Sequence, residues 1–149
     1  MVYSLADYQL SIACNDSALA AILGDKFSIG GDGEQNALDT ISVSYTENLW
    51  NTESYATGSW VHNKNLSKVG TITVNLNMLS SFTSILTRLC KQYYGRLFRS
   101  GLTLTITDRN GQSIAKGTDC YPVKIPDLSL QSTAQMNEWQ FTCGQIENF

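Results

Sequence analysis

Apolar and polar residues alternate in several short segments of the chain, which is the pattern of β-strands that bury one face. In the clearest of them, Ile41, Val43 and Tyr45 alternate with serine and threonine. The same period predicts strands at residues 8–14, 71–77, 102–107, 112–116 and 138–146. In three of these segments (41–47, 71–77 and 102–107) the polar face consists almost entirely of Ser, Thr and Asn.

One segment has a helical period instead. Residues 80–94 carry apolar side chains at spacings of three and four, which form the stripe of an amphipathic helix. The stripe consists of Phe82, Ile85, Leu86, Leu89, Cys90 and Tyr93. Ser80 or Ser81 is predicted to cap the helix start, and Gly95 to end it in a left-handed conformation. Residues 17–23 are compatible with either a helical turn or a strand-like insert.

Turn signals separate these elements. Gly30, Gly31 and Gly33 predict a loop, because the spacing is neither GxGxxG nor a P-loop. Residues 108–111 (DRNG) predict a hairpin turn with positive φ angles at Asn-Gly. Residues 121–126 contain two prolines and predict an extended edge or loop.

Residues 47–65 form a long polar segment without a clear period, which contains Trp50, Tyr55 and Trp60. Long irregular segments in compact domains are usually functional or disordered, and large aromatic residues argue against disorder. We therefore expect an extended arm or loop whose aromatic side chains dock on a surface. That surface is either the domain's own core or a neighbouring subunit, where Trp and Tyr are frequent anchors.

The order of these elements predicts one domain, residues 1–149, that is mainly β with a single flanking helix. An antiparallel sandwich or barrel suits this order. Only 15% of the 149 residues are charged, against about 25% in average domains. The formal net charge of −3 lacks the basic footprint of a nucleic-acid binder.

The uncharged polar strand faces suit the lining of a channel that neither binds nor strongly repels a polyanion. The strand propensity of Thr is the ordinary alternative explanation. The candidate lining residues are Ser42, Ser44, Thr46, Thr71, Thr73, Asn75, Thr103 and Thr105.

The residues do not predict a catalytic or metal site. Four cysteines without a CxxC pair and a single histidine, His62, give no zinc pattern, and buried thiols of a reducing cytoplasm are expected. The carboxylates are scattered, and GxSxG is absent. The residues 1–14 do not predict a signal peptide, and no apolar run is long enough to span a membrane. We expect a protein that is not an enzyme and needs no cofactor.

With these elements in place, the sequence resembles the tail-tube (inner tube) proteins of contractile-tailed bacteriophages. Four segments in the expected order carry the resemblance. They are residues 3–7 (YSLAD), 69–76 (VGTITVNL), 107–111 (TDRNG) followed by Pro122 and Pro126, and 137–141 (NEWQF). Residues 17–23 are not placed by it.

The resemblance implies two packed sheets with a helix at the flank, and six subunits per ring whose inner strands close a β-barrel around a lumen. Rings would stack into a tube that conducts DNA during genome ejection. The implied partners are further copies of the chain, the tail sheath, terminator and baseplate hub proteins, and the tape-measure protein and DNA in the lumen without specific binding. The implied location is the virion tail, after synthesis in the host bacterial cytoplasm, without direct lipid binding. Under this interpretation Trp50, Tyr55 and Trp60 are candidate inter-subunit contacts.

Other interpretations stay open. A tube-cap or adaptor protein of the tail would share the fold, as would the inner tube of a bacteriocin or a type VI secretion machine. A carbohydrate-binding β-module would use the tryptophans to line a sugar site. A hydrolase would need a site around Asp32, Glu34 and His62.

Overall fold

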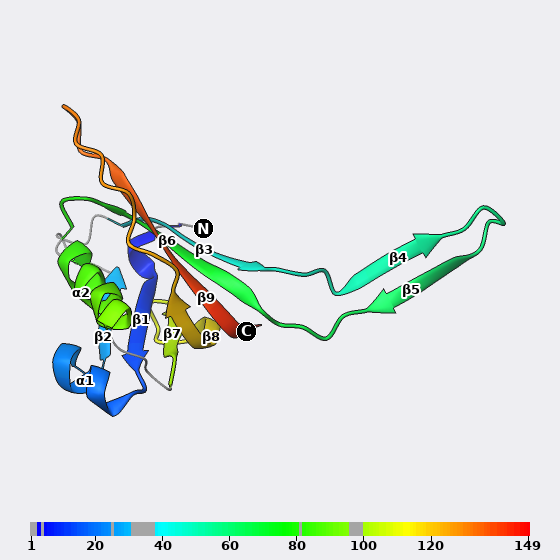
Figure 1. Ribbon diagram of the computed structural model, residues 1–149, viewed down its shortest axis with the longest axis horizontal. Helices are drawn as coiled ribbons and strands as arrows, with labels where there is room; N and C mark the ends of the chain where they lie inside the picture. Colours follow the sequence, from blue (N-terminus) through cyan, green and yellow to red (C-terminus); the bar gives the residue numbers. More distant parts are fainter. Residues whose placement is uncertain (1–2, 4, 25, 31–37, 81, 96–99) are drawn as a thin grey trace.

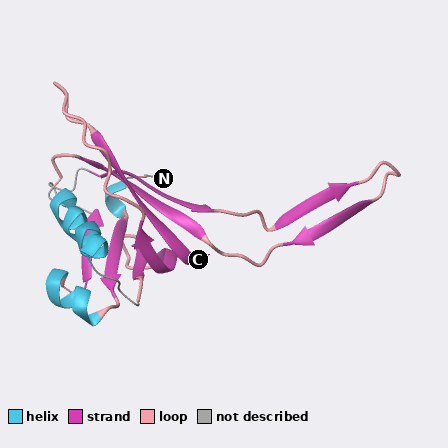
Figure 2. Ribbon diagram, viewed as in Figure 1, coloured by secondary structure: helices cyan, strands magenta, loops and turns pink. Residues whose placement is uncertain are grey.

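A computed structural model describes residues 3, 5–24, 26–30, 38–80, 82–95 and 100–149. Within them the chain is mainly β, with helices on one side and a long two-stranded projection on the other (Figures 1 and 2). The helical elements are η1 (Leu5–Asp7), α1 (Ser17–Leu23) and α2 (Phe82–Gly95). The strands are β1 (Gln9–Cys14), β2 (Lys26–Gly30), β3 (Leu38–Tyr45), β4 (Trp50–Ser54), β5 (Trp60–Lys64), β6 (Gly70–Asn77), β7 (Leu102–Thr107), β8 (Ser113–Pro122) and β9 (Met136–Asn148).

Seven strands form one antiparallel sheet in the order β2-β1-β7-β8-β9-β6-β3, and β4 and β5 form a separate pair. The predicted mainly-β class with a flanking helix is confirmed. The resemblance implied two packed sheets, whereas the described strands join into one continuous sheet. The two halves join because β8 pairs with β7 on one side and with β9 on the other. Strands β6 and β9 run obliquely past β1 and β7 (Figure 1).

The core lies on the face of the sheet toward which the predicted apolar positions point. Burial alternates residue by residue along β6 and β7, as their sequences predict. Trp139 and Phe141 of β9 are the largest fully buried side chains, and Leu86 and Leu89 of α2 pack against this cluster. Each fully buried side chain of this kind stabilises the fold by about 1.5–3 kcal/mol.

The structure shows the conformation of residues 17–23 and the two ends of α2. Residues 17–23 form the helix α1, capped by Asp16, whose Oδ1 accepts a hydrogen bond from the Ala18 backbone N–H at 2.9 Å. Ser80 caps α2, because its Oγ accepts from the Phe82 N–H at 3.3 Å. Ser81 lies outside the described residues. The prediction for Gly95 is wrong: it is the last residue of α2, but its φ is not positive. Many helices end without a left-handed residue.

Strand β2 was not predicted. It pairs with β1 at an edge of the sheet, and Gly30 ends it with φ +99°. Its five residues sit between a helix and a glycine cluster, so too little alternation was visible to indicate a strand. The other members of that cluster, Gly31 and Gly33, lie outside the described residues, as do Asp32 and Glu34.

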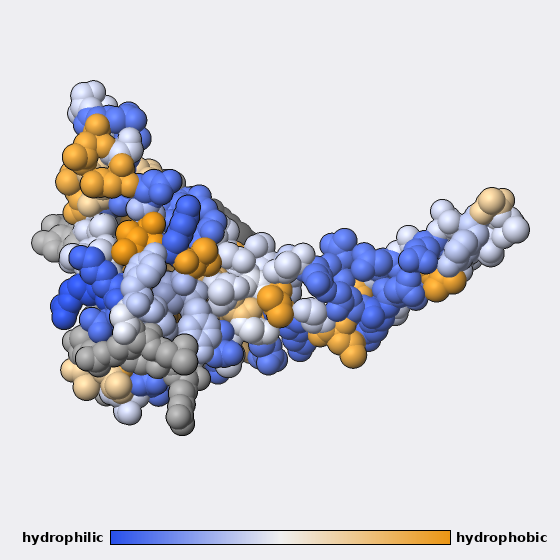
Figure 3. Space-filling view, in the orientation of Figure 1, coloured by the Kyte–Doolittle hydropathy of each residue, from blue (hydrophilic) through white to orange (hydrophobic). Residues whose placement is uncertain are grey.

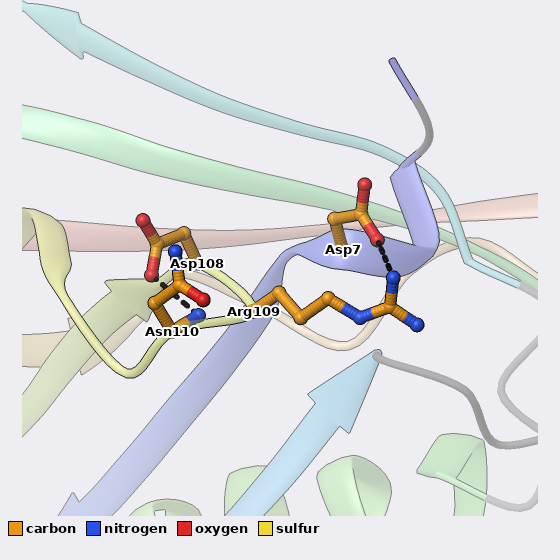
Figure 4. Close-up of polar contacts among 4 residues, drawn as sticks. All are labelled: Asp7, Asp108, Arg109 and Asn110. Carbon is orange, nitrogen blue, oxygen red and sulfur yellow. Dashed lines mark hydrogen bonds and ion pairs between the residues drawn. The ribbon is translucent and has the colours of Figure 1, made fainter. Parts of the chain in front are cut away.

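The hairpin turn between β7 and β8 forms where it was predicted, but with different chemistry (Figure 4). Only Gly111 has a positive φ, +80°, so the turn does not use the mirror-image conformation expected at Asn110. Instead Oδ1 of Asp108 accepts hydrogen bonds from the backbone N–H groups of Asn110 (3.0 Å) and Gln112 (2.9 Å). Arg109 Nη1 lies 3.7 Å from Asp7 Oδ1, and this exposed ion pair adds little stability.

All four cysteines are buried thiols, as expected. Burial raises the pKa of Cys90 to about 11, so this thiol is unreactive at neutral pH. Cys120 and Cys143 are opposite one another on β8 and β9, with their sulfur atoms 2.6 Å apart. The described part of the chain holds no cluster of three metal-ligating side chains. None of its helices has both the length and the apolar character needed to cross a membrane.

Candidate assembly surfaces

The projection is a β-hairpin, which we call the arm (residues 50–64). At its root the Asn65 backbone N–H donates to the Leu49 carbonyl at 2.8 Å, and the Thr46 N–H donates to the Val69 carbonyl at 3.0 Å. All residues of β4 and β5 are exposed. An isolated two-stranded hairpin is at best marginally stable in water. The arm therefore has the properties of a segment that another molecule covers.

The register of the arm divides its three candidate contact residues between two faces. Paired residues of an antiparallel hairpin share a face. Trp50 pairs with Lys64 and Ser54 with Trp60, so the two tryptophans lie on the same face. Tyr55 belongs to the opposite face, where its hydroxyl donates to Glu53 at 3.2 Å. The exposed fractions of Trp50, Tyr55 and Trp60 are 53%, 51% and 65%. None of them docks on the chain's own core.

Polar contacts hold the tryptophan face in place. The Lys64 Nζ lies over the Trp50 ring, 5.8 Å from its centroid. Between the tryptophans, the Thr52 hydroxyl and His62 Nδ1 are 2.8 Å apart and share a hydrogen bond. Both contacts join β4 to β5 across this exposed face. His62, which the hydrolase interpretation required, is thus a member of this face.

The structure brings five of the eight candidate lining residues together on one polar face. Ser42 and Ser44 of β3 lie opposite Thr73 and Thr71 of β6, with Asn75 next along β6. The Asn75 Nδ2 donates to the Thr40 hydroxyl at 2.7 Å.

The remaining three candidates lie elsewhere. Thr46 follows the end of β3 at the root of the arm. Thr103 and Thr105 are on β7, which β8 and β9 separate from β6. Thr105 lies opposite Ser11 and Lys116. Strand order, which the alternation pattern does not encode, decides this separation.

Strand β9 contributes polar residues that the sequence analysis missed. Glu138, Gln140 and Thr142 lie opposite Asn75, Thr73 and Thr71 and extend the polar face. They alternate with the buried Trp139 and Phe141, so the same period-2 argument would have found them. We call the joint surface of β3, β6 and β9 the polar sheet face.

A groove of about 870 Å³ lies beside the root of the arm, and we call it the root groove. It is lined by Tyr45 and by residues 47–49, 64–68 and 146–149. Leu49, Leu66 and Phe149 are the most exposed of its large hydrophobic side chains. Lys64 and Lys68 are its basic residues, and Glu47 and Glu147 its acidic ones.

Comparison with known proteins identifies the family of this chain. The family model described as bacteriophage PhiTE tail tube protein matches residues 1–149. The chain belongs to this family. It is therefore a structural protein of the phage tail and not an enzyme. No relative was found among curated protein sequences.

Solved structures agree with this tail tube fold. A chain of an extracellular contractile injection system, from a structure of the PVC sheath/tube terminator in the extended state, superposes with a TM-score of 0.54 at 12% identity, covering 99% of this chain and 96% of that one. A chain from the baseplate of the anti-feeding prophage superposes with a TM-score of 0.54 at 8% identity, covering 99% and 94%. A chain from the PVC sheath-tube complex gives 0.50 at 11% identity, with 99% and 93% covered. At these identities the likeness establishes the fold of this tail tube family member.

Proposed function

We propose that six copies of this chain form a ring and that rings stack into the inner tube of a contractile tail, which conducts DNA during genome ejection. The observation that carries this proposal is the arm. It is exposed along its whole length, and two tryptophans share one of its faces. Trp is among the most frequent interface anchors. We propose that Trp50, Tyr55 and Trp60 contact a neighbouring subunit.

The sheet supports ring closure. Its edge strands are β2 and β3, and exposed edges lead to uncontrolled pairing unless they are covered. Pairing between neighbouring subunits would cover such edges and build a continuous barrel. Residues 1–149 would form a single tail-tube domain in each subunit.

The polar sheet face is our candidate for the lumen lining. Its uncharged polar side chains and the acidic Glu138 would let DNA and the tape-measure protein slide without specific binding, since phosphate binding requires basic residues. Six copies would carry six times the formal charge of −3. The proposed outer and end partners are the sheath, terminator and baseplate hub proteins. Similar chains come from a sheath-tube complex and a baseplate, which supports partners of this kind.

A tube terminator is the second candidate function. A chain of similar fold comes from a structure described as a sheath/tube terminator. A terminator would form a single ring and would not polymerise.

Electron microscopy of the purified full-length chain over a concentration series tests the proposal. We expect rings at low concentration and hollow tubes with a central pore at high concentration. Single rings at every concentration would favour the terminator. A monomer at every concentration would refute both.

Replacing both tryptophans, Trp50→Ala with Trp60→Ala, is expected to raise the concentration needed for tube formation by at least about 30-fold. This corresponds to the loss of about 2 kcal/mol, the threshold of an interface hot spot. The readout is the pelleted fraction against concentration. Thr57→Ala, at the tip of the arm, is the control and should assemble normally. Normal assembly of the double variant would show that the tryptophan face is not an anchor.

A lysine on the polar sheet face tests the lumen assignment. Thr73 is half-buried and lies between Ser42 and Gln140. The substitution Thr73→Lys should therefore change the free energy of unfolding by less than about 1 kcal/mol. A ring of six such lysines would hold the DNA backbone and slow ejection. The rate of genome release is measured in phage that carries the variant. Thr73→Gln, of similar reach but uncharged, is the control. Equal release rates for the two variants would place this face outside the lumen.

A further inference from the structure

We propose that the segment between β8 and β9 of one copy packs into the root groove of another copy. We call residues 123–135 the tip segment. This inference rests on the proposed tube function and deepens it, because it names two surfaces through which copies would meet. It concerns neither the arm's tryptophan face nor the polar sheet face.

The tip segment exposes apolar side chains on an irregular part of the chain. The Val123 N–H donates to the Gln140 carbonyl at 2.9 Å, Ile125 still packs against the core, and the Gln135 carbonyl accepts from the Met78 N–H at 2.9 Å where the chain returns to β9. Leu128 and Leu130 are 74% and 75% exposed. Residues two apart in a chain have Cα atoms no more than roughly 7 Å apart. The tip segment therefore offers a pair of adjacent leucines.

The space-filling view shows where such side chains gather. Apolar residues cover much of the projection at the upper left in Figure 3, the end that the tip segment forms in Figure 1. Contiguous exposed apolar surface on a protein usually marks an interaction site. The tip segment is thus a second projecting element besides the arm.

The root groove has the properties of a binding site for Leu128 and Leu130. Its exposed apolar side chains Leu49, Leu66 and Phe149 form part of the lining of a volume of about 870 Å³. This volume is within the range that holds a drug-sized molecule, and thus a short peptide segment. Lys64 and Lys68 lie along the groove.

The occupant must come from another copy because of where the two surfaces lie. In Figure 1 the tip segment projects from the end of the body opposite to the arm, whereas the groove adjoins the arm's root. A chain with complementary surfaces at opposite ends makes head-to-tail contacts, which repeat from copy to copy. Both surfaces carry both signs of charge: the tip segment has Lys124 and Asp127, and the groove has two lysines and two glutamates, so Asp127 can face Lys68 while Lys124 faces a glutamate. Opposite charges at an interface fix register.

Cysteine cross-linking of the assembled full chain tests the contact. We expect Leu66→Cys with Leu128→Cys to give, under a mild oxidant, a ladder of covalent multimers on a non-reducing gel. The native cysteines do not interfere, since all four are buried. The control is Leu79→Cys with Leu128→Cys. Leu79 is as exposed as Leu66 (78% each), but its N–H bonds to Asn77 beyond β6, away from the groove. This control should give no ladder.

Electron microscopy of the same samples separates the two proposals. Tubes without a ladder in the Leu66–Leu128 variant would overturn the groove contact and leave the tube function intact. A wild-type chain that forms neither rings nor tubes would overturn the tube function itself. Ladders of equal length from both cysteine pairs would show unspecific collision and would also overturn the contact.

A charge exchange tests the register independently of the cysteines. Asp127→Lys and Lys68→Asp should each raise the concentration needed for assembly at least threefold. The double variant should return it to the wild-type value, because it restores the opposite charges. Additive losses in the double variant would contradict the proposed pairing.

Discussion

Removing the arm is expected to abolish tube formation while leaving the body folded. The structure indicates a clean way to do this: Trp50–Lys64 is replaced by Asn-Gly. Leu49 and Asn65 already form a backbone hydrogen bond of 2.8 Å, so a two-residue turn closes the shortened hairpin between them. Among the described strands, β4 and β5 pair only with each other, and hence the seven-stranded sheet loses no described partner.

Two measurements check this variant. Thermal unfolding should show a body whose midpoint lies within a few degrees of the wild type, and electron microscopy should show no tubes at concentrations where the wild type polymerises. The Thr57→Ala chain serves as the matched control for handling and purity. Tubes of normal length from the armless chain would contradict the role that we propose for the arm.

The substitution Gly70→Ala, near the root of the arm, is expected to destabilise the fold strongly, because the added methyl group has no room. Gly70 begins β6 between Tyr45 of β3 and Cys143 of β9. A Cβ at this position would overlap the Ser44 carbonyl oxygen and the Cδ1 of Ile146. The carbonyl is backbone and cannot rotate away, so β3 and β6 must separate. We expect a loss of about 3 kcal/mol, at the upper end of overpacking costs.

For a domain of this size, such a loss lowers the unfolding midpoint by about 10 °C. Differential scanning calorimetry measures it. Gly95→Ala is the matched control, because its added methyl meets no atom within 4 Å and its φ is not positive. It should leave the midpoint unchanged or raise it slightly. If both variants unfold at the wild-type temperature, β3 does not pack against β6 as described.

The arm shows how far the sequence alone could lead. The sequence predicted a long exposed segment with Trp50, Tyr55 and Trp60 as anchors, but left open whether they dock on the chain's own core. The structure folds the segment as a hairpin clear of the body. It also places Tyr55 on the face opposite to the tryptophans. Which residues share a face depends on register, and register depends on the pairing of two strands.

The candidate lining residues show the same division. Alternation correctly separated the polar from the apolar side of β6 and β7, because a strand's period of two is a local property. Which strands lie next to each other is not local. In the order β7-β8-β9-β6-β3, Ser42 of β3 lies opposite Thr73 of β6, whereas Thr105 of β7 is separated from both by β8 and β9. It also adds Gln140, which the sequence analysis left out.

The sequence by itself determined the identity and apolar side of most strands, the stripe of α2, and the scarcity of charge, because all of these follow from local period and composition. Tertiary structure decided the continuous seven-stranded sheet, the helical state of residues 17–23, the Asp108-based turn and the root groove. Each of these depends on contacts between residues far apart in the chain or on backbone angles that several sequences can adopt. Long-range strand pairing therefore determines where the arm, the polar sheet face and the root groove lie, whereas the local sequence pattern determines which side chains they expose.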